Sequence, residues 1–144
     1  MTTTSARWFQ LFKLKGNTLA NMKGQVIEVV GAVDAENRNV GVNNAKGGMA
    51  QEWDIIYVDE MPAALKIGEE NKDWGFKINS PFYVVSKKAR GYFLDLLGNN
   101  MVMKTRNGMT SQQWYFDQKT RTIKSVRTPS KSWDIQSSGK ASNL

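Results

Sequence analysis

The chain contains no cysteine and no histidine among its 144 residues. Without cysteine it can form neither disulfides nor thiolate metal and redox sites, which suits a reducing compartment. Without histidine it cannot build a Ser-His-Asp or Cys-His arrangement or a His-ligated metal centre. Adjacent carboxylates such as Asp59 and Glu60 are typical of solvated turns, not of a glycosidase pair. The sequence therefore predicts a protein that is not an enzyme and that needs neither cofactor nor metal.

Long apolar runs are also missing. No stretch approaches the roughly 18 consecutive apolar residues of a transmembrane helix. Residues 1–25 contain no long apolar segment of the kind that a secretory signal requires. We therefore expect an intracellular, cytoplasmic protein with no membrane span. Because no acidic residue precedes Glu28, import into an organelle stays open.

Acidic residues are scarce in one half of the chain only. Residues 1–73 carry 8 Lys and Arg against 10 Asp and Glu, whereas residues 74–144 carry 12 against 3, and the net charge is +7. Such an asymmetry predicts a basic surface that meets an acidic partner. The candidate partners are acidic protein segments, sulfated or acidic glycans, membrane head groups and nucleic acid.

What the chain does contain is a repeat. Residues 39–53, NVGVNNAKGGMAQEW, align without a gap on residues 100–114, NMVMKTRNGMTSQQW. Upstream, GQVIEVVG at 24–31 matches GYFLDLLG at 91–98 in its glycine, aliphatic and acidic positions. The offset is 61 residues in the first match and 67 in the second, so the first copy carries six extra residues. Each copy has a Gln two positions before a Trp, and we expect all four residues to be structural: Gln51, Trp53, Gln112 and Trp114.

The rest of the chain extends this repeat. Residues 8–12 match 81–85 as opening strands, and short extended segments follow each Trp strand, with Trp74 and Trp133 as counterparts. Short strands that alternate with Gly, Asn and Pro turns favour an all-β sandwich or barrel. We predict a single domain over residues 1–144, made of about twelve short strands, with repeat halves at about 8–79 and 81–138.

This pattern resembles the ricin B-type, Gln-x-Trp β-trefoil lectins, most closely over residues 82–136. The resemblance implies a β-trefoil-like barrel. A trefoil has three units, whereas only two Gln-x-Trp motifs are visible here, so a two-fold barrel stays an alternative.

The resemblance also implies where a sugar would bind. The acid of the second strand would accept sugar hydroxyls, an aromatic after the third strand would stack on the ring, and an Asn before Gln-x-Trp would donate. Asp95 and Glu28 keep the acid, but Lys104 and Asn43 stand where the aromatic is expected, so the usual sugar sites are degenerate. A polar ligand would still find the following candidate residues: Asp95, Asn99, Asn100, Lys104, Glu28 and Asn43.

We expect a non-catalytic, lectin-like interaction module. The favoured role is protein–protein binding or a structural subunit of a larger assembly, through a basic face of Lys87, Lys88, Arg90 and Arg106. The alternative is a carbohydrate-binding lectin for acidic or sulfated glycans. Binding of single-stranded nucleic acid ranks below both, because the basic and aromatic run at 86–93 falls within the strand pattern.

Overall fold

The computed structural model describes residues 11–29, 40–45, 47–58, 70–71, 74–88, 91–135 and 141–143. Nearly all of the regular structure in these ranges is β-strand, and the helical segments are two short 3-10 turns, Met49–Gln51 and Thr110–Gln112. In the described part of the chain no helix is long and apolar enough to cross a membrane. The prediction of an all-β fold is therefore confirmed.

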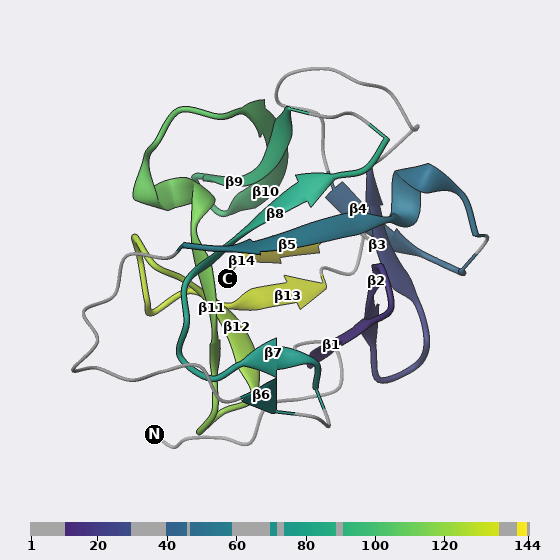
Figure 1. The fold of residues 1–144 in the computed structure, drawn as a ribbon, viewed down its shortest axis with the longest axis horizontal. Coiled ribbons are helices and arrows are strands. Elements are labelled where there is room, and N and C mark those ends of the chain that lie inside the picture. The colour runs from purple at the N-terminus through teal and green to yellow at the C-terminus, as the bar shows by residue number, and fades with distance from the viewer. Residues whose placement is uncertain are drawn as a thin grey trace.

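The strands are short, and the longest, β9 and β10, have six residues each (Figure 1). Their bounds, in chain order, are β1 (Phe12–Lys15), β2 (Thr18–Asn21), β3 (Val26–Val29), β4 (Val40–Asn43), β5 (Trp53–Tyr57), β6 (Glu70–Asn71), β7 (Phe76–Lys77), β8 (Phe82–Ser86), β9 (Tyr92–Leu97), β10 (Asn100–Thr105), β11 (Trp114–Asp117), β12 (Thr122–Ser125), β13 (Trp133–Ile135) and β14 (Ala141–Asn143).

Six of the strands form a barrel from three antiparallel pairs, β1–β2, β5–β8 and β11–β12. In each pair the first residue of the first strand lies opposite the last residue of the second. Neighbouring pairs are joined where Trp114 pairs with Phe82 and where the Trp53 N–H donates to the Asn17 carbonyl at 2.8 Å. The three pairs therefore occupy equivalent places around one axis.

Three hairpins accompany the barrel: β3–β4, β9–β10 and β13–β14. Their second strands meet one another, since β14 contacts both β4 and β10. Figure 1 shows β9–β10 at the upper left and β3–β4 at the right, with β13 and β14 below β5. Together with the barrel pairs, the hairpins give the molecule three related units, which settles the choice between a trefoil and a two-fold barrel.

Two of the units are continuous in the chain, β2–β5 and β8–β11. The third takes β12, β13 and β14 from the end of the described chain and β1 from its start. In each unit one bridge joins a barrel strand to the hairpin that follows it. These bridges are Ala20 with Val26, Val85 with Phe93, and Lys124 with Ser132. The third unit, which has no Gln-x-Trp motif, is thus split between the start and the end of the described chain.

This arrangement corrects the predicted alignment at the start of the chain. The sequence predicts a match of residues 8–12 with 81–85, of which 8–10 lie outside the described residues. The strand equivalent to β8 is β2, because β2 pairs with β3 as β8 pairs with β9. Phe12 begins a strand equivalent to the Trp strands β5 and β11. Trp74 and Trp133 are not counterparts either: Trp133 lies in β13, whereas Trp74 lies in the turn before β7.

Aromatic side chains fill the barrel. Trp133 makes edge-on contacts with Phe12 and Trp114, with ring centroids 5.5 and 5.6 Å apart. Phe76 lies between Phe82 and Phe116 and stacks on both at 5.3 and 5.5 Å. All six of these side chains are fully buried. Offset and edge-on ring pairs add to the free energy that their burial already supplies.

The segment between β5 and β8 is an insertion that contains the small hairpin β6–β7. Figure 1 shows this hairpin beside β1 at one end of the barrel. The Leu14 N–H donates to the Trp74 carbonyl at 2.9 Å. Gly75 permits this approach, because a Cβ at that position would lie 2.6 Å from the Leu14 carbonyl oxygen. One of the short extended segments predicted after the first Trp strand, residues 64–68, lies outside the described residues.

Candidate binding site

The second Gln-x-Trp motif makes a defined set of internal contacts. The Gln112 amide nitrogen donates to the Thr105 carbonyl at 2.9 Å and to one carboxylate oxygen of Asp95 at 3.2 Å. The Trp114 indole N–H donates to the Leu94 carbonyl at 3.2 Å. A short 3-10 turn before β11 positions Gln112. These bonds tie the end of β10 and the start of β11 to β9.

The first motif repeats the same contacts. The Gln51 amide nitrogen donates to the Asn44 carbonyl at 2.9 Å and to Glu28 Oε1 at 3.0 Å. The Trp53 indole N–H donates to the Ile27 carbonyl at 3.2 Å. These partners match those of the second motif at the offsets found in the sequence alignment. Glu28 and Ile27 lie 67 residues before Asp95 and Leu94, and Asn44 lies 61 residues before Thr105. The other oxygen of Glu28 accepts from the Asn43 side chain at 2.9 Å.

The two acids differ in exposure. Glu28 is half-buried and both of its oxygens accept hydrogen bonds. Asp95 is 4% exposed, and its second oxygen is buried without a hydrogen-bond partner. Because Asp95 is buried, a sugar hydroxyl can reach neither of its carboxylate oxygens unless the residues around it move. The third unit carries an acid in the equivalent place, Asp134, which follows Trp133 and is also buried.

Within the described residues, no hydrogen bond joins Asp95 to another of the candidate ligands. Asn99 lies in the β9–β10 turn, and its side chain accepts a hydrogen bond from the Lys131 amine. Asn100 pairs with Leu97 and with Ser142, and Lys104 lies opposite Phe93 in the β9–β10 ladder. Only Glu28 and Asn43 come together as a hydrogen-bonded pair among the six predicted ligands.

The predicted basic face is partly engaged. The Lys87 amine forms an ion pair with Asp54 at 2.8 Å. The Arg106 guanidinium lies 5.9 Å from the centroid of the Tyr83 ring, within the range of a cation–π contact. Lys88 is exposed after β8, and Arg90 lies outside the described residues.

Arg106 belongs to a surface that sequence reasoning missed. Tyr83 makes an edge-on contact with Phe93, with centroids 5.4 Å apart, and its hydroxyl accepts from the Gln113 amide at 3.4 Å. Ile56, which is 50% exposed, pairs with Tyr83 in the ladder of β5 and β8. We call this surface the outer face: Ile56, Tyr83, Phe93, Lys104, Arg106 and Gln113. Alternation along FYVVS at 82–86 could have placed Tyr83 outward, but only strand pairing brings it to Phe93 and Arg106.

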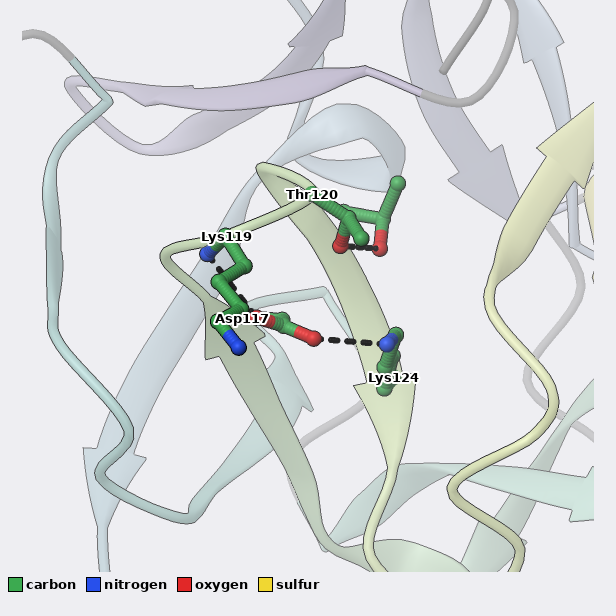
Figure 2. A network of polar contacts seen from close by, with 5 residues as sticks. Asp117, Lys119, Thr120 and Lys124 are labelled. Carbon is green, nitrogen blue, oxygen red and sulfur yellow. Dashed lines mark hydrogen bonds and ion pairs between the residues drawn. The ribbon is translucent and has the colours of Figure 1, made fainter. Parts of the chain in front are cut away.

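A separate polar network closes the β11–β12 turn (Figure 2). Asp117 accepts from the Lys124 amine at 2.6 Å and from the Lys119 N–H at 2.9 Å. Burial raises the pKa of Asp117, but hydrogen bonds from Lys124 and from the backbone N–H groups of Lys119 and Thr120, with the charge of Lys124, outweigh it. The pKa therefore lies below its usual value. The network stabilises the β11–β12 turn.

Comparisons with solved structures identify the fold. The chain is similar to a designed 3-fold symmetric protein, ThreeFoil, with a TM-score of 0.60 and 16% identity over 84% of this chain and 80% of that one. It is also similar to the cytolethal distending toxin from Actinobacillus actinomycetemcomitans, with a TM-score of 0.58 and 14% identity over 88% and 76% of the two chains.

A mosquitocidal holotoxin gives a TM-score of 0.64 and 14% identity over 90% of this chain, which spans 15% of the toxin chain. No protein-family model and no curated protein sequence matches the chain. Identities this low establish the fold alone. The molecule is a β-trefoil.

Proposed function

We propose that the chain is a non-catalytic interaction module that binds an acidic protein segment through the outer face. The observation that carries this proposal is the position of the Arg106 guanidinium over Tyr83, next to Phe93 and to the exposed Ile56. Aromatic residues and arginine are enriched at the centres of protein interfaces, where their large contact area and charge act together.

The internal contacts of the acids support protein binding over sugar binding. Asp95 is buried against Gln112, so the residue that a ricin B-type site would offer to a sugar is occupied inside the fold. In contrast, Lys104 and Arg106 lie on the outer face, in the half of the chain with 12 basic and 3 acidic residues. A field of one sign raises the association rate of an oppositely charged partner.

A second candidate is binding of an acidic or sulfated glycan. It is favoured by the hydrogen-bonded pair of Glu28 and Asn43, which stays half-exposed in the first unit, and by the rings of Tyr83 and Phe93 next to cations. Sulfate groups would contact the cations and a sugar ring would stack on an aromatic side chain.

The test compares these ligands on one protein. A labelled peptide that alternates glutamate with aliphatic residues, an array that includes sulfated and uronic-acid glycans, and a single-stranded oligonucleotide are measured at low and physiological salt. We expect peptide binding that weakens with salt. Arg106→Ala should weaken it about three- to tenfold, in the range of an interfacial cation.

The matched control is Lys119→Ala, which removes the same charge from the exposed β11–β12 turn. If both variants lose affinity equally, binding follows net charge and the outer face is not the site. Selective binding of a glycan that depends on Glu28 would establish the second candidate instead.

A further inference from the structure

The three units differ at one edge of the barrel. Leu14 in β1, Ile55 in β5 and Phe116 in β11 are equivalent, because each follows by two positions the residue that begins its strand. Each lies opposite an equivalent residue of its partner strand, Leu19, Val84 and Ile123. Their main-chain groups on the side away from that partner strand can therefore be compared directly.

Two of these positions are occupied by the insertion between β5 and β8. The Leu14 N–H donates to the Trp74 carbonyl at 2.9 Å. The Phe116 carbonyl accepts from the Asn79 N–H at 3.2 Å, and Ile78 forms a parallel bridge with Phe116. One continuous stretch, residues 74–79, thus supplies main-chain partners to both β1 and β11.

The third position, at Ile55, is open. Odd-numbered residues of β5 direct their main-chain groups away from β8, as the bond from the Trp53 N–H to Asn17 shows. Within the described residues no main-chain group bonds to Ile55 on that side. A cavity of about 280 Å³ lies there instead, lined by Trp53, Ile55, Tyr57, Asn17 and Lys77 among others.

We propose that this groove binds the main chain of an extended polypeptide segment from a partner. The peptide group of the partner would pair with the Ile55 N–H and carbonyl, as residues 74–79 pair with the equivalent residues of β1 and β11. Adding a strand at a free sheet edge is a general mode of peptide recognition, in which main-chain bonds give affinity and side-chain pockets give specificity. At Leu14 and Phe116 the partner is a main-chain group, and a main-chain group would fit at Ile55 in the same way.

The side chains around the groove select the peptide. Asp54 is paired with Lys87, so its charge is balanced. The Lys77 amine lies 4.8 Å from the Tyr57 ring centroid and has no ion pair within the described residues. The groove therefore favours a peptide with an acidic side chain next to the paired residue.

Amide hydrogen exchange in the free protein is the first test. We expect the Leu14 N–H to be protected and the Ile55 N–H to exchange rapidly, although both lie at equivalent positions. A capped peptide of alternating valine and threonine with one central glutamate should then protect the Ile55 N–H. Protection of the Ile55 N–H without peptide would overturn the proposal, because the chain itself would already fill the groove.

Two controls separate this groove from the outer face. The same peptide methylated on its central main-chain nitrogens should not bind, and this control leaves the protein unaltered. Lys77→Glu should weaken the glutamate peptide about three- to fivefold, as for a partly exposed ion pair, and should favour a lysine peptide. Arg106→Ala should leave both results unchanged. If the peptide binds but its affinity changes only with Arg106→Ala, the proposal for the groove is wrong and the proposal for the outer face is retained.

Discussion

At the scale of single residues, each Gln-x-Trp pair joins three separate strands. The indole N–H of Trp114 reaches β9 and its ring packs on Trp133 of the third unit, 5.6 Å between centroids. No other residue type supplies that volume together with a donor at its rim. The same reasoning applies to Trp53, whose N–H reaches β3.

We therefore expect Trp114→Ala to lower the free energy of unfolding by about 3–5 kcal/mol, as for a fully buried large aromatic. Chemical denaturation followed by circular dichroism measures this. Tyr115→Ala on the same strand, where the side chain is half-exposed, is the control and should cost far less. Equal stability of both variants would contradict the role of Trp114 in the core.

Gln112 and Gln51 make the same bonds in different surroundings, which allows a second prediction. Gln112→Leu removes the amide that donates to the buried Asp95 and to the Thr105 carbonyl, and we expect a cost of about 1–3 kcal/mol. Gln51→Leu should cost less, because Glu28 is half-exposed and water can replace the lost donor. The two free energies of unfolding, measured in parallel, check this order, and a larger loss for Gln51→Leu would refute it.

The turn of Figure 2 predicts a pH dependence. The folded pKa of Asp117 lies below its unfolded value, so its contribution to stability is present above that unfolded value, about 3.9. This contribution is lost as the pH falls through the folded pKa. In acid titrations of stability, the difference between the wild type and Asp117→Asn should therefore shrink as the pH falls below about 4. A constant difference down to low pH would show that Asp117 gains nothing from Lys124.

At the scale of elements, the insertion depends on one glycine. Gly75 has a φ of +85°, and an added Cβ would collide with the Leu14 carbonyl oxygen. We expect Gly75→Ala to cost several times more than Gly24→Ala, which has the same φ but nothing within 4 Å of the added Cβ. A positive φ alone costs a non-glycine residue about 1–2 kcal/mol. Thermal unfolding compares the two variants, and equal costs would mean that the contact with Leu14 relaxes freely.

The sequence predicted the elements of two units and missed the third. Gln51, Trp53, Gln112 and Trp114 stand out because each unit is continuous and both copies share residue identities. The third unit has Phe12 in place of the Trp, and its partners Trp133 and Asp134 stand about 120 residues further along. No local pattern joins segments so far apart, since only barrel closure makes them neighbours.

The candidate surfaces were harder to predict for the same reason. Lys104 and Arg106 were visible as charges, but their relation to Tyr83 and Phe93 follows from the ladders of β8, β9 and β10. The groove at Ile55 is defined by a main-chain group and a cavity, and side-chain identity carries no signal for either.

At the scale of the whole molecule, β1 completes the third unit. A chain that begins at Asn17 would lack Phe12, which is fully buried against Trp133. We expect it to lose cooperative thermal unfolding. A synthetic peptide of residues 1–16 should restore the transition, whereas the same peptide with Phe12→Ala should not. Unchanged melting of the shortened chain would show that β1 is dispensable.

The split unit also bears on the time that the chain needs to fold. Trp133, the partner of Phe12, is made about 120 residues after it. At a synthesis rate of about 5–20 residues per second, Phe12 waits roughly 6–24 s before that partner exists. Contacts between distant residues also slow folding, because the loop between them must close first. During this interval the apolar side of β1 is open to chaperones and to misassembly, and barrel closure by the last strands ends that exposure.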